Sequence, residues 1–172
     1  MISDIDFEGR IQLSGWKNVT NCGELVGQTN ESTRVAVIDL TAVCSLFHIK
    51  AAICKALLNE QQNCMKTKSI SAEVLYQLSP VTKINDSIKT YGATESSTTV
   101  AVLILDNDSI GQELLTQIKG TAFDLEQLSS SEYLSSDKVS SISKYFKLTP
   151  QELEVSSLES AVITRLAIKD CL

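Results

Sequence analysis

The spacing of apolar residues along the chain predicts four β-strands. Short apolar runs that alternate with polar residues, or that are continuous and rich in β-branched residues, are typical of strands. The run at 98–105 gives the strongest signal, and its last residues are apolar on both faces, which predicts a central position in a sheet. In chain order, the predicted strands span 10–16, 34–40, 98–105 and 121–125.

Apolar residues recur at helical spacing between these strands and after the last one. Asn21 is placed to cap the first helix, and Gly92 suits the left-handed position that ends another. Thr149, Pro150 and Glu152 match a capping box with a proline in the first turn. The predicted helices span 19–28, 41–62, 71–78, 82–92, 109–118 and 137–146, followed by a short helix from 150 and a last one over 157–169.

The order of these elements is βαβ, three helices, βαβ and a helical tail. Two βαβ units in one chain can pair into a ferredoxin-like antiparallel sheet. We therefore predict an α+β fold with a central, mostly antiparallel sheet of about four strands (βαβ–helical insertion–βαβ), helices packed around it and a helical C-terminus. The length of 172 residues fits one domain over 1–172.

Composition narrows the class of protein. Hydrophobic residues make up 43% and charged residues 21%, as in ordinary globular proteins, and the net charge of -6 argues against an autonomous nucleic-acid binder. The first six residues are acidic and unlike a signal peptide, and no apolar stretch reaches the about 18 residues that span a membrane. We expect a protein of the cytoplasm and nucleus that binds no membrane, with its five cysteines as free thiols or small apolar residues.

The sequence contains one candidate nucleophile, Cys44, placed four residues before the single histidine, His48, on the predicted long helix. A thiol–imidazole pair is one way to activate a nucleophile. No third residue orients the imidazole, so we favour a core-facing cysteine beside a partly exposed histidine. The carboxylates of Asp106 and Asp108 are interpreted as caps for the next helix, and no glycine-rich nucleotide loop or zinc spacing is present. We expect a non-catalytic binding protein with no cofactor and no metal site.

Charge is distributed unevenly. Segment 50–89 contains six lysines and three acidic residues, a local net charge of +3, so the chain's -6 leaves -9 for the rest. Tyr76 within this segment could offer its ring to a base. The alternative is a solvated lysine face with Tyr76 in the core, which residue chemistry alone favours. A stand-alone RNA-binding module acting through segment 50–89 is therefore the second functional hypothesis.

The last predicted helix has an unusually wide apolar stripe. A wide apolar helix near a chain end is either deeply packed or shared with a partner, and the residues leave these two interpretations open. The stripe consists of Leu158, Ala161, Val162 and Leu166, widened by Ile163, Ala167 and Ile168.

A long run in the lysine-rich segment has a specific order, KTKSISAEVLYQLSP at 66–80, followed by Lys83-Ile84 and Tyr91-Gly92. Together with 100–105 and the RLAIKD run at 165–170, it resembles the signature of the PRPK-binding (TPRKB-like) accessory subunits of the KEOPS, or EKC, complex. The resemblance covers nearly the whole chain.

The resemblance implies a small, non-catalytic α/β subunit that binds a PRPK-type atypical kinase/ATPase. That kinase contacts the threonylcarbamoyltransferase, which would be an indirect partner. The complex makes threonylcarbamoyl-adenosine (t6A) in tRNA, and the accessory subunit supports this modification and assists tRNA binding. This chain has PVTK at 80–83 where archaeal members tend to be more basic, which implies weak tRNA binding by the chain alone.

The resemblance also implies two sets of site residues. The expected kinase-binding residues are Arg165, Leu166, Ile168, Lys169, Asp170 and Leu172. The expected tRNA-binding residues are Lys66, Lys68, Ser79, Lys83 and Ile84. If the first set is correct, Leu166→Glu is expected to leave the fold intact and to abolish co-purification with the kinase.

Overall fold

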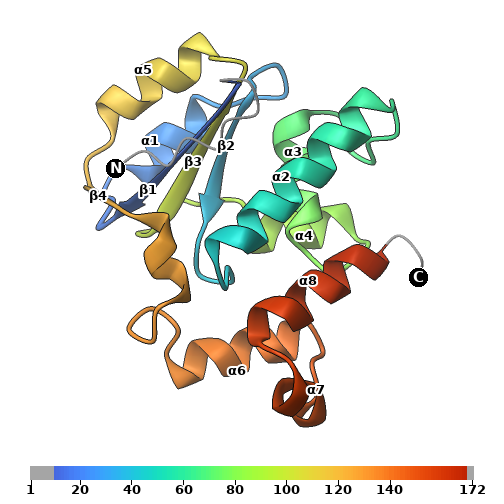
Figure 1. Ribbon diagram of the computed structural model, residues 1–172. Helices are drawn as coiled ribbons and strands as arrows, with labels where there is room; N and C mark the ends of the chain where they lie inside the picture. The colour runs from blue at the N-terminus through green and yellow to red at the C-terminus, as the bar shows by residue number, and fades with distance from the viewer. Residues whose placement is uncertain (1–9, 170–172) are drawn as a thin grey trace.

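The computed structural model describes residues 10–169, and a four-stranded sheet lies at its centre (Figure 1). The strands β1 (Ile11–Lys17), β2 (Val35–Asp39), β3 (Val100–Leu105) and β4 (Thr121–Phe123) are arranged in the order β2-β3-β1-β4. Every neighbouring pair is antiparallel. Each βαβ unit therefore leaves a gap that one strand of the other unit fills, and the predicted ferredoxin-like sheet is confirmed.

Strand β3 is central, and all six of its residues are buried. Its odd-numbered residues pack on one face of the sheet and its even-numbered residues on the other. Helices α1 (Cys22–Gly27) and α5 (Ser109–Gln117) cover the face that bears Val102 and Ile104. Because both faces are covered, the strand reads as a continuous apolar run, as predicted.

The helical insertion covers the opposite face (Figure 1). It contains α2 (Leu46–Gln61), α3 (Ile70–Gln77) and α4 (Ile84–Tyr91). The prediction that the first of these helices begins at 41 is wrong, because the Ser45 hydroxyl accepts a hydrogen bond from the His48 backbone N–H and caps the helix there. Cys44 therefore precedes α2.

The remaining elements form a helical lobe below the sheet in Figure 1. They are the 3-10 helix η1 (Leu125–Ser129) and helices α6 (Ser136–Tyr145), α7 (Pro150–Val155) and α8 (Leu158–Ile168). A third apolar cluster attaches α6 and α8 to the residues just before α2, and it consists of Cys44, Ile142, Phe146, Val162 and Leu166. The predicted capping box of α7 is confirmed. No helix within residues 10–169 is both long and apolar enough to cross a membrane.

Two predicted helix ends are wrong. The Asn21 side chain does not cap α1; it accepts a hydrogen bond from the Lys119 backbone N–H and donates one to the Gln117 carbonyl, so it holds the connection between α5 and β4. Gly92 is extended, with φ -71° and ψ 130°, instead of left-handed. A Cβ atom at Gly92 would lie 2.6 Å from the Ile88 carbonyl oxygen, so close backbone approach is what requires glycine there.

Gly111 lets α5 approach the sheet closely, because a Cβ atom there would lie 2.8 Å from the side chains of Val35 and Ile104. We expect Gly111→Ala to lower the free energy of unfolding by about 1–3 kcal/mol through overpacking, as measured by urea denaturation. Gly27→Ala is the matched control, because a Cβ atom at Gly27 meets nothing within 4 Å. An equal effect of both substitutions would show that α5 has room to move outward.

Candidate partner-binding surfaces

The Cys44–His48 pair lies in the interior of the molecule. The His48 side chain is fully buried, and its Nε2 lies 2.9 Å from the Leu78 carbonyl oxygen, to which it donates. Its Nδ1 faces Cys44, 3.7 Å from the sulfur atom, and Tyr91 and Phe146 contact the ring edge-to-face. The expectation of a partly exposed histidine is therefore wrong. Because α2 begins after Ser45, its first turn directs His48 into the interior.

Burial determines the protonation of both groups. It raises the pKa of the Cys44 thiol to about 11 and lowers the pKa of His48 to about 4. At neutral pH the thiol stays protonated and the imidazole stays neutral. A thiolate–imidazolium pair does not form under these conditions, and this geometry gives no support to catalysis by Cys44.

His48 should make the stability of the fold depend on pH below 7. Its pKa is about 4 in the folded chain, against about 6.5 when unfolded, so the unfolded state binds more protons between these values. Stability is therefore full above pH 6.5 and falls as the pH drops toward 4. We expect a loss of about 2 kcal/mol between pH 7 and pH 5, measured by urea denaturation.

His48→Gln is the control for this loss, because glutamine retains an N–H donor for the Leu78 carbonyl but does not titrate. His48 is the only histidine in the chain, so the loss between pH 7 and pH 5 should largely disappear in the variant. A wild-type and a variant protein that lose stability in parallel would contradict a buried neutral imidazole.

The lysine-rich segment presents three of its predicted tRNA-binding residues to solvent. Lys66 and Lys68 are exposed in the loop before α3, and Lys83 is exposed at the start of α4. Ile84 is half-buried beside Lys83. Ser79 is fully buried, and its hydroxyl is hydrogen-bonded to the Tyr145 hydroxyl at 2.8 Å, which gives it an internal role.

A buried carboxylate, Glu73, organises the loop that carries Lys66 and Lys68. It accepts hydrogen bonds from the backbone N–H groups of Lys66 and Thr67, each at 3.0 Å, and from the side chains of Asn59 and Gln77. Burial acts to raise the pKa of Glu73, but these hydrogen bonds together lower it below its usual value. The ionised carboxylate thus holds the loop in one conformation, an acidic role that the sequence did not reveal.

The C-terminal residues divide between the interior and the surface. Leu166 is buried against Phe146 and Val162, whereas Ile168 is 37% exposed and Ala167 is exposed. The expectation that Leu166→Glu leaves the fold intact is therefore wrong, because the substitution would place a charge in an apolar cluster. Asp170 and Leu172 lie outside the described residues.

The other two predicted kinase-binding residues make contacts within the chain. Arg165 is half-buried and pairs with Glu152 at 2.6 Å. Lys169 is buried, with its ammonium 2.5 Å from the Tyr76 carbonyl oxygen and 3.2 Å from the centre of the Tyr76 ring. Tyr76 is buried as well, so the hypothesis that its ring is open to a base is wrong.

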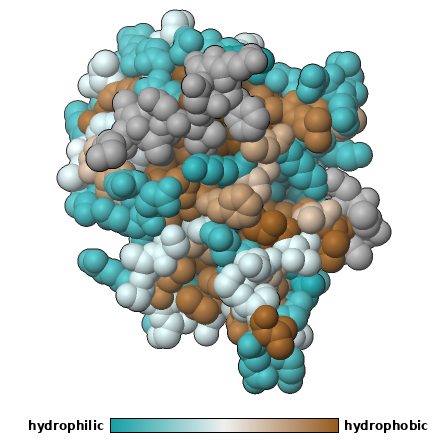
Figure 2. Space-filling view, in the orientation of Figure 1, coloured by the Kyte–Doolittle hydropathy of each residue, from teal (hydrophilic) through white to brown (hydrophobic). Residues whose placement is uncertain are grey.

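Apolar side chains also reach the surface elsewhere. An apolar patch lies over α7 at the bottom of Figure 2, and Val155 on that helix is 86% exposed. Phe47 and Leu58 on α2 are 53% and 49% exposed. They are eleven residues apart, which places them on the same side of the helix. Helix α2 thus packs against the sheet with one side and presents apolar residues to solvent on another.

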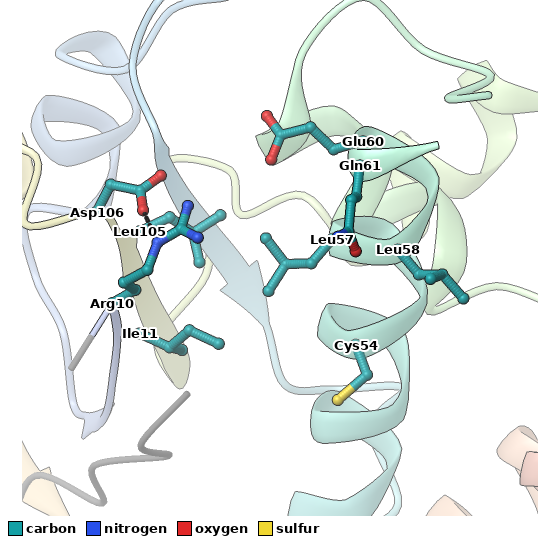
Figure 3. Close-up of a pocket in the computed structure, with 9 residues that line it drawn as sticks. All are labelled: Arg10, Ile11, Cys54, Leu57, Leu58, Glu60, Gln61, Leu105 and Asp106. Atoms are coloured by element: carbon teal, nitrogen blue, oxygen red, sulfur yellow. Dashed lines mark hydrogen bonds and ion pairs between the residues drawn. The ribbon is translucent and has the colours of Figure 1, made fainter. Parts of the chain in front are cut away.

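A groove of about 520 Å³ lies between α2 and the ends of β1 and β3. Figure 3 shows Cys54 and Leu57 pointing from α2 toward Ile11 and Leu105 on the other wall. Its rim carries Arg10, Glu60 and Asp106. Arg10 pairs with Asp106, and Arg34 bridges Asp106 to Glu60, so the charges at the rim are paired with each other.

The positions of the cysteines and acidic residues show no metal-binding arrangement in the part of the chain that the structure describes. Cys22 and Cys44 are buried free thiols, and Cys54 and Cys64 are exposed ones. Among residues 10–169, no three His, Cys, Asp or Glu side chains gather closely enough to hold a metal ion.

Comparison with known proteins identifies the family to which the chain belongs. Residues 16–170 match the family model described as kinase binding protein CGI-121. The chain is 30% identical over 159 residues to the EKC/KEOPS complex subunit TPRKB of Danio rerio, which covers 90% of this chain and 88% of that protein. It is 26% identical over 172 residues to the EKC/KEOPS complex subunit cgi121 of Schizosaccharomyces pombe, covering 96% and 98% of the two chains. The chain therefore belongs to the CGI-121 family of kinase binding proteins.

Proposed function

We propose that this protein is a non-catalytic subunit of a KEOPS (EKC) complex and binds the PRPK-type kinase/ATPase of that complex. The match to the CGI-121 family over residues 16–170 is the observation that carries the proposal. Relatives from a vertebrate and from fungi are named as subunits of this complex. Through the kinase, the chain would associate indirectly with the threonylcarbamoyltransferase and support t6A modification of tRNA. We further propose that it works in the cytoplasm and nucleus.

Helix α8 is the surface that we assign to the kinase. Its two-sided stripe supports this assignment, because Val162 and Leu166 pack inward while Ala167 and Ile168 face solvent near the end of the helix. Exposed apolar side chains that a partner can bury are typical of the core of a protein interface. Arg165 and Lys169 would act by holding the end of α8 in place.

Ile168→Glu should abolish co-purification with the kinase, because it places a charge in the proposed contact. Its effect on the free energy of unfolding should stay within about 0.5 kcal/mol, since Ile168 lies at the surface. The measurement is a pull-down of the tagged chain with the kinase, combined with urea denaturation of the variant.

Ile110→Glu on α5 is the matched control, since Ile110 is also 37% exposed and undergoes the same apolar-to-acidic change. Helix α5 lies on the opposite side of the sheet from the proposed contact, so the Ile110→Glu variant should retain the kinase. Retention of the kinase by the folded Ile168→Glu variant would remove α8 from the interface.

A second function, assistance in tRNA binding, is supported by the exposure of Lys66, Lys68 and Lys83 on neighbouring elements. Changing all three to glutamine should weaken tRNA binding and flatten its salt dependence. Each phosphate contact releases counterions when it forms, so a variant with fewer contacts releases fewer counterions on binding. The expected change in the slope of log affinity against log salt is about 0.7–0.9 per phosphate contact.

The control removes three other exposed lysines, Lys119, Lys144 and Lys147, and changes the net charge equally. It should leave the slope closer to that of the wild type. Equal slopes for the two triple variants would mean that tRNA responds to overall charge and not to the lysines of this segment.

A further inference from the structure

A second cavity, of about 400 Å³, lies between α6 and two segments of the sheet layer. One segment follows β2 and the other precedes β3. We call it the hydroxyl pocket, because most of the side chains that line it carry hydroxyl groups. They are Thr41, Thr98, Thr99, Tyr133 and Ser141, together with the charged side chains of Asp137 and Lys138.

Lys138 is held in a fixed position in the wall of this pocket. Its ammonium donates to the Leu40 carbonyl oxygen at 3.0 Å and lies 3.3 Å from the centre of the Tyr133 ring. The Tyr133 hydroxyl donates to the same carbonyl oxygen at 2.7 Å. The amine is therefore positioned by two groups, the Leu40 carbonyl oxygen and the Tyr133 ring, which the Tyr133 hydroxyl holds together, unlike the freely moving amine of a surface lysine.

Burial lowers the pKa of Lys138 to about 8. Electrostatic interactions with Cys44 and Asp39 act to raise this pKa and offset part of the effect of burial. At pH 7.5 roughly a quarter of such amines are neutral, compared with about 0.1% of a lysine with the usual pKa near 10.4. Only the neutral amine has a lone pair to donate. Lys138 therefore combines a defined position, a cavity in front of it and a large neutral fraction.

We propose that Lys138 is a modification site that takes an acyl group from a small neutral thioester bound in the hydroxyl pocket. The Nζ lone pair attacks the acyl carbon, the C–N bond forms and the C–S bond breaks. The thiolate leaves with the bonding electron pair and takes up the proton that the nitrogen loses. The hydroxyl groups of Thr99 and Ser141 can donate to the oxygen of the acyl group.

The charge of the pocket favours a neutral acyl donor. Asp137 lines the pocket, and Asp39 lies at the end of β2, close enough to Lys138 to affect its titration. These carboxylates repel an anionic donor such as an acyl phosphate. A thioester carries no charge at the reacting group and avoids this repulsion.

Acylation would have a structural consequence. It removes the positive charge that faces the Tyr133 ring, and the added group cannot occupy the space between that ring and the Leu40 carbonyl. Helix α6 would lose one of its attachments to the sheet layer. The modification would thus loosen the C-terminal lobe without touching α8.

The test is acetylation of the full-length chain by S-acetyl-N-acetylcysteamine at pH 7.5, followed by hydroxylamine to remove groups from cysteines and by peptide mapping. Lys144, exposed on the same helix, is the internal reference. We expect Lys138 to react at least about ten times faster than Lys144, because Lys138 lines the pocket that holds the thioester and Lys144 does not. The preference should disappear in concentrated urea. Equal rates in the folded chain, or a preference that persists in urea, would overturn the proposal.

Two further comparisons test the role of the pocket. Ser141→Ala should slow acetylation of Lys138 severalfold, whereas Ser140→Ala, at an exposed neighbour outside the pocket, should not. Acetyl phosphate should show a weaker preference for Lys138 than the thioester does. Unchanged rates in Ser141→Ala would overturn binding in the hydroxyl pocket, and an equal preference with acetyl phosphate would overturn the assignment to a neutral donor.

Discussion

The Nε2–H group of His48 donates to the Leu78 carbonyl oxygen at 2.9 Å, at the place where α2 meets the end of α3. The same imidazole contacts Tyr91 of the sheet-side core and Phe146 of the C-terminal lobe. His48 thus contacts the end of α3, Tyr91 of α4 and Phe146 of the C-terminal lobe through one side chain. A buried carbonyl without this donor would cost about 1–3 kcal/mol, so the arrangement of the helices depends on a neutral, correctly oriented histidine.

Other chemically capable side chains are also used to hold the chain together. Glu73 accepts hydrogen bonds from backbone N–H groups of the loop before α3. Lys169, at the end of α8, donates a hydrogen bond to the Tyr76 carbonyl oxygen. Lys138 does the same for α6 through the Leu40 carbonyl. Lys66, Lys68 and Lys83 stay exposed, as do the apolar side chains of Phe47, Leu58 and Ile168, in a chain that belongs to a family of kinase binding proteins.

The candidate surfaces were only partly predictable. Spacing correctly suggested that α8 has a wide apolar stripe, but it could not say that Leu166 packs on Phe146 while Ile168 stays in solvent. That division depends on where α6 lies, a helix that ends at Tyr145, 21 residues before Leu166. Ser79 and Lys169 matched a family motif, yet their buried side chains bond to Tyr145 and Tyr76, partners far away in sequence.

The sequence by itself determined the sheet and the family. Strands β2 and β3 follow from their continuous apolar runs, the α7 start follows from its capping box, and the run at 66–80 indicated the family. These features depend on near neighbours in the chain, so local patterns predict them. Tertiary structure alone decided the environment of His48, the role of Asn21 and the extended conformation of Gly92. Each involves contacts between distant segments, which for Gly92 is the bridge to Ile38 of β2, and hydrophobic spacing does not encode such contacts.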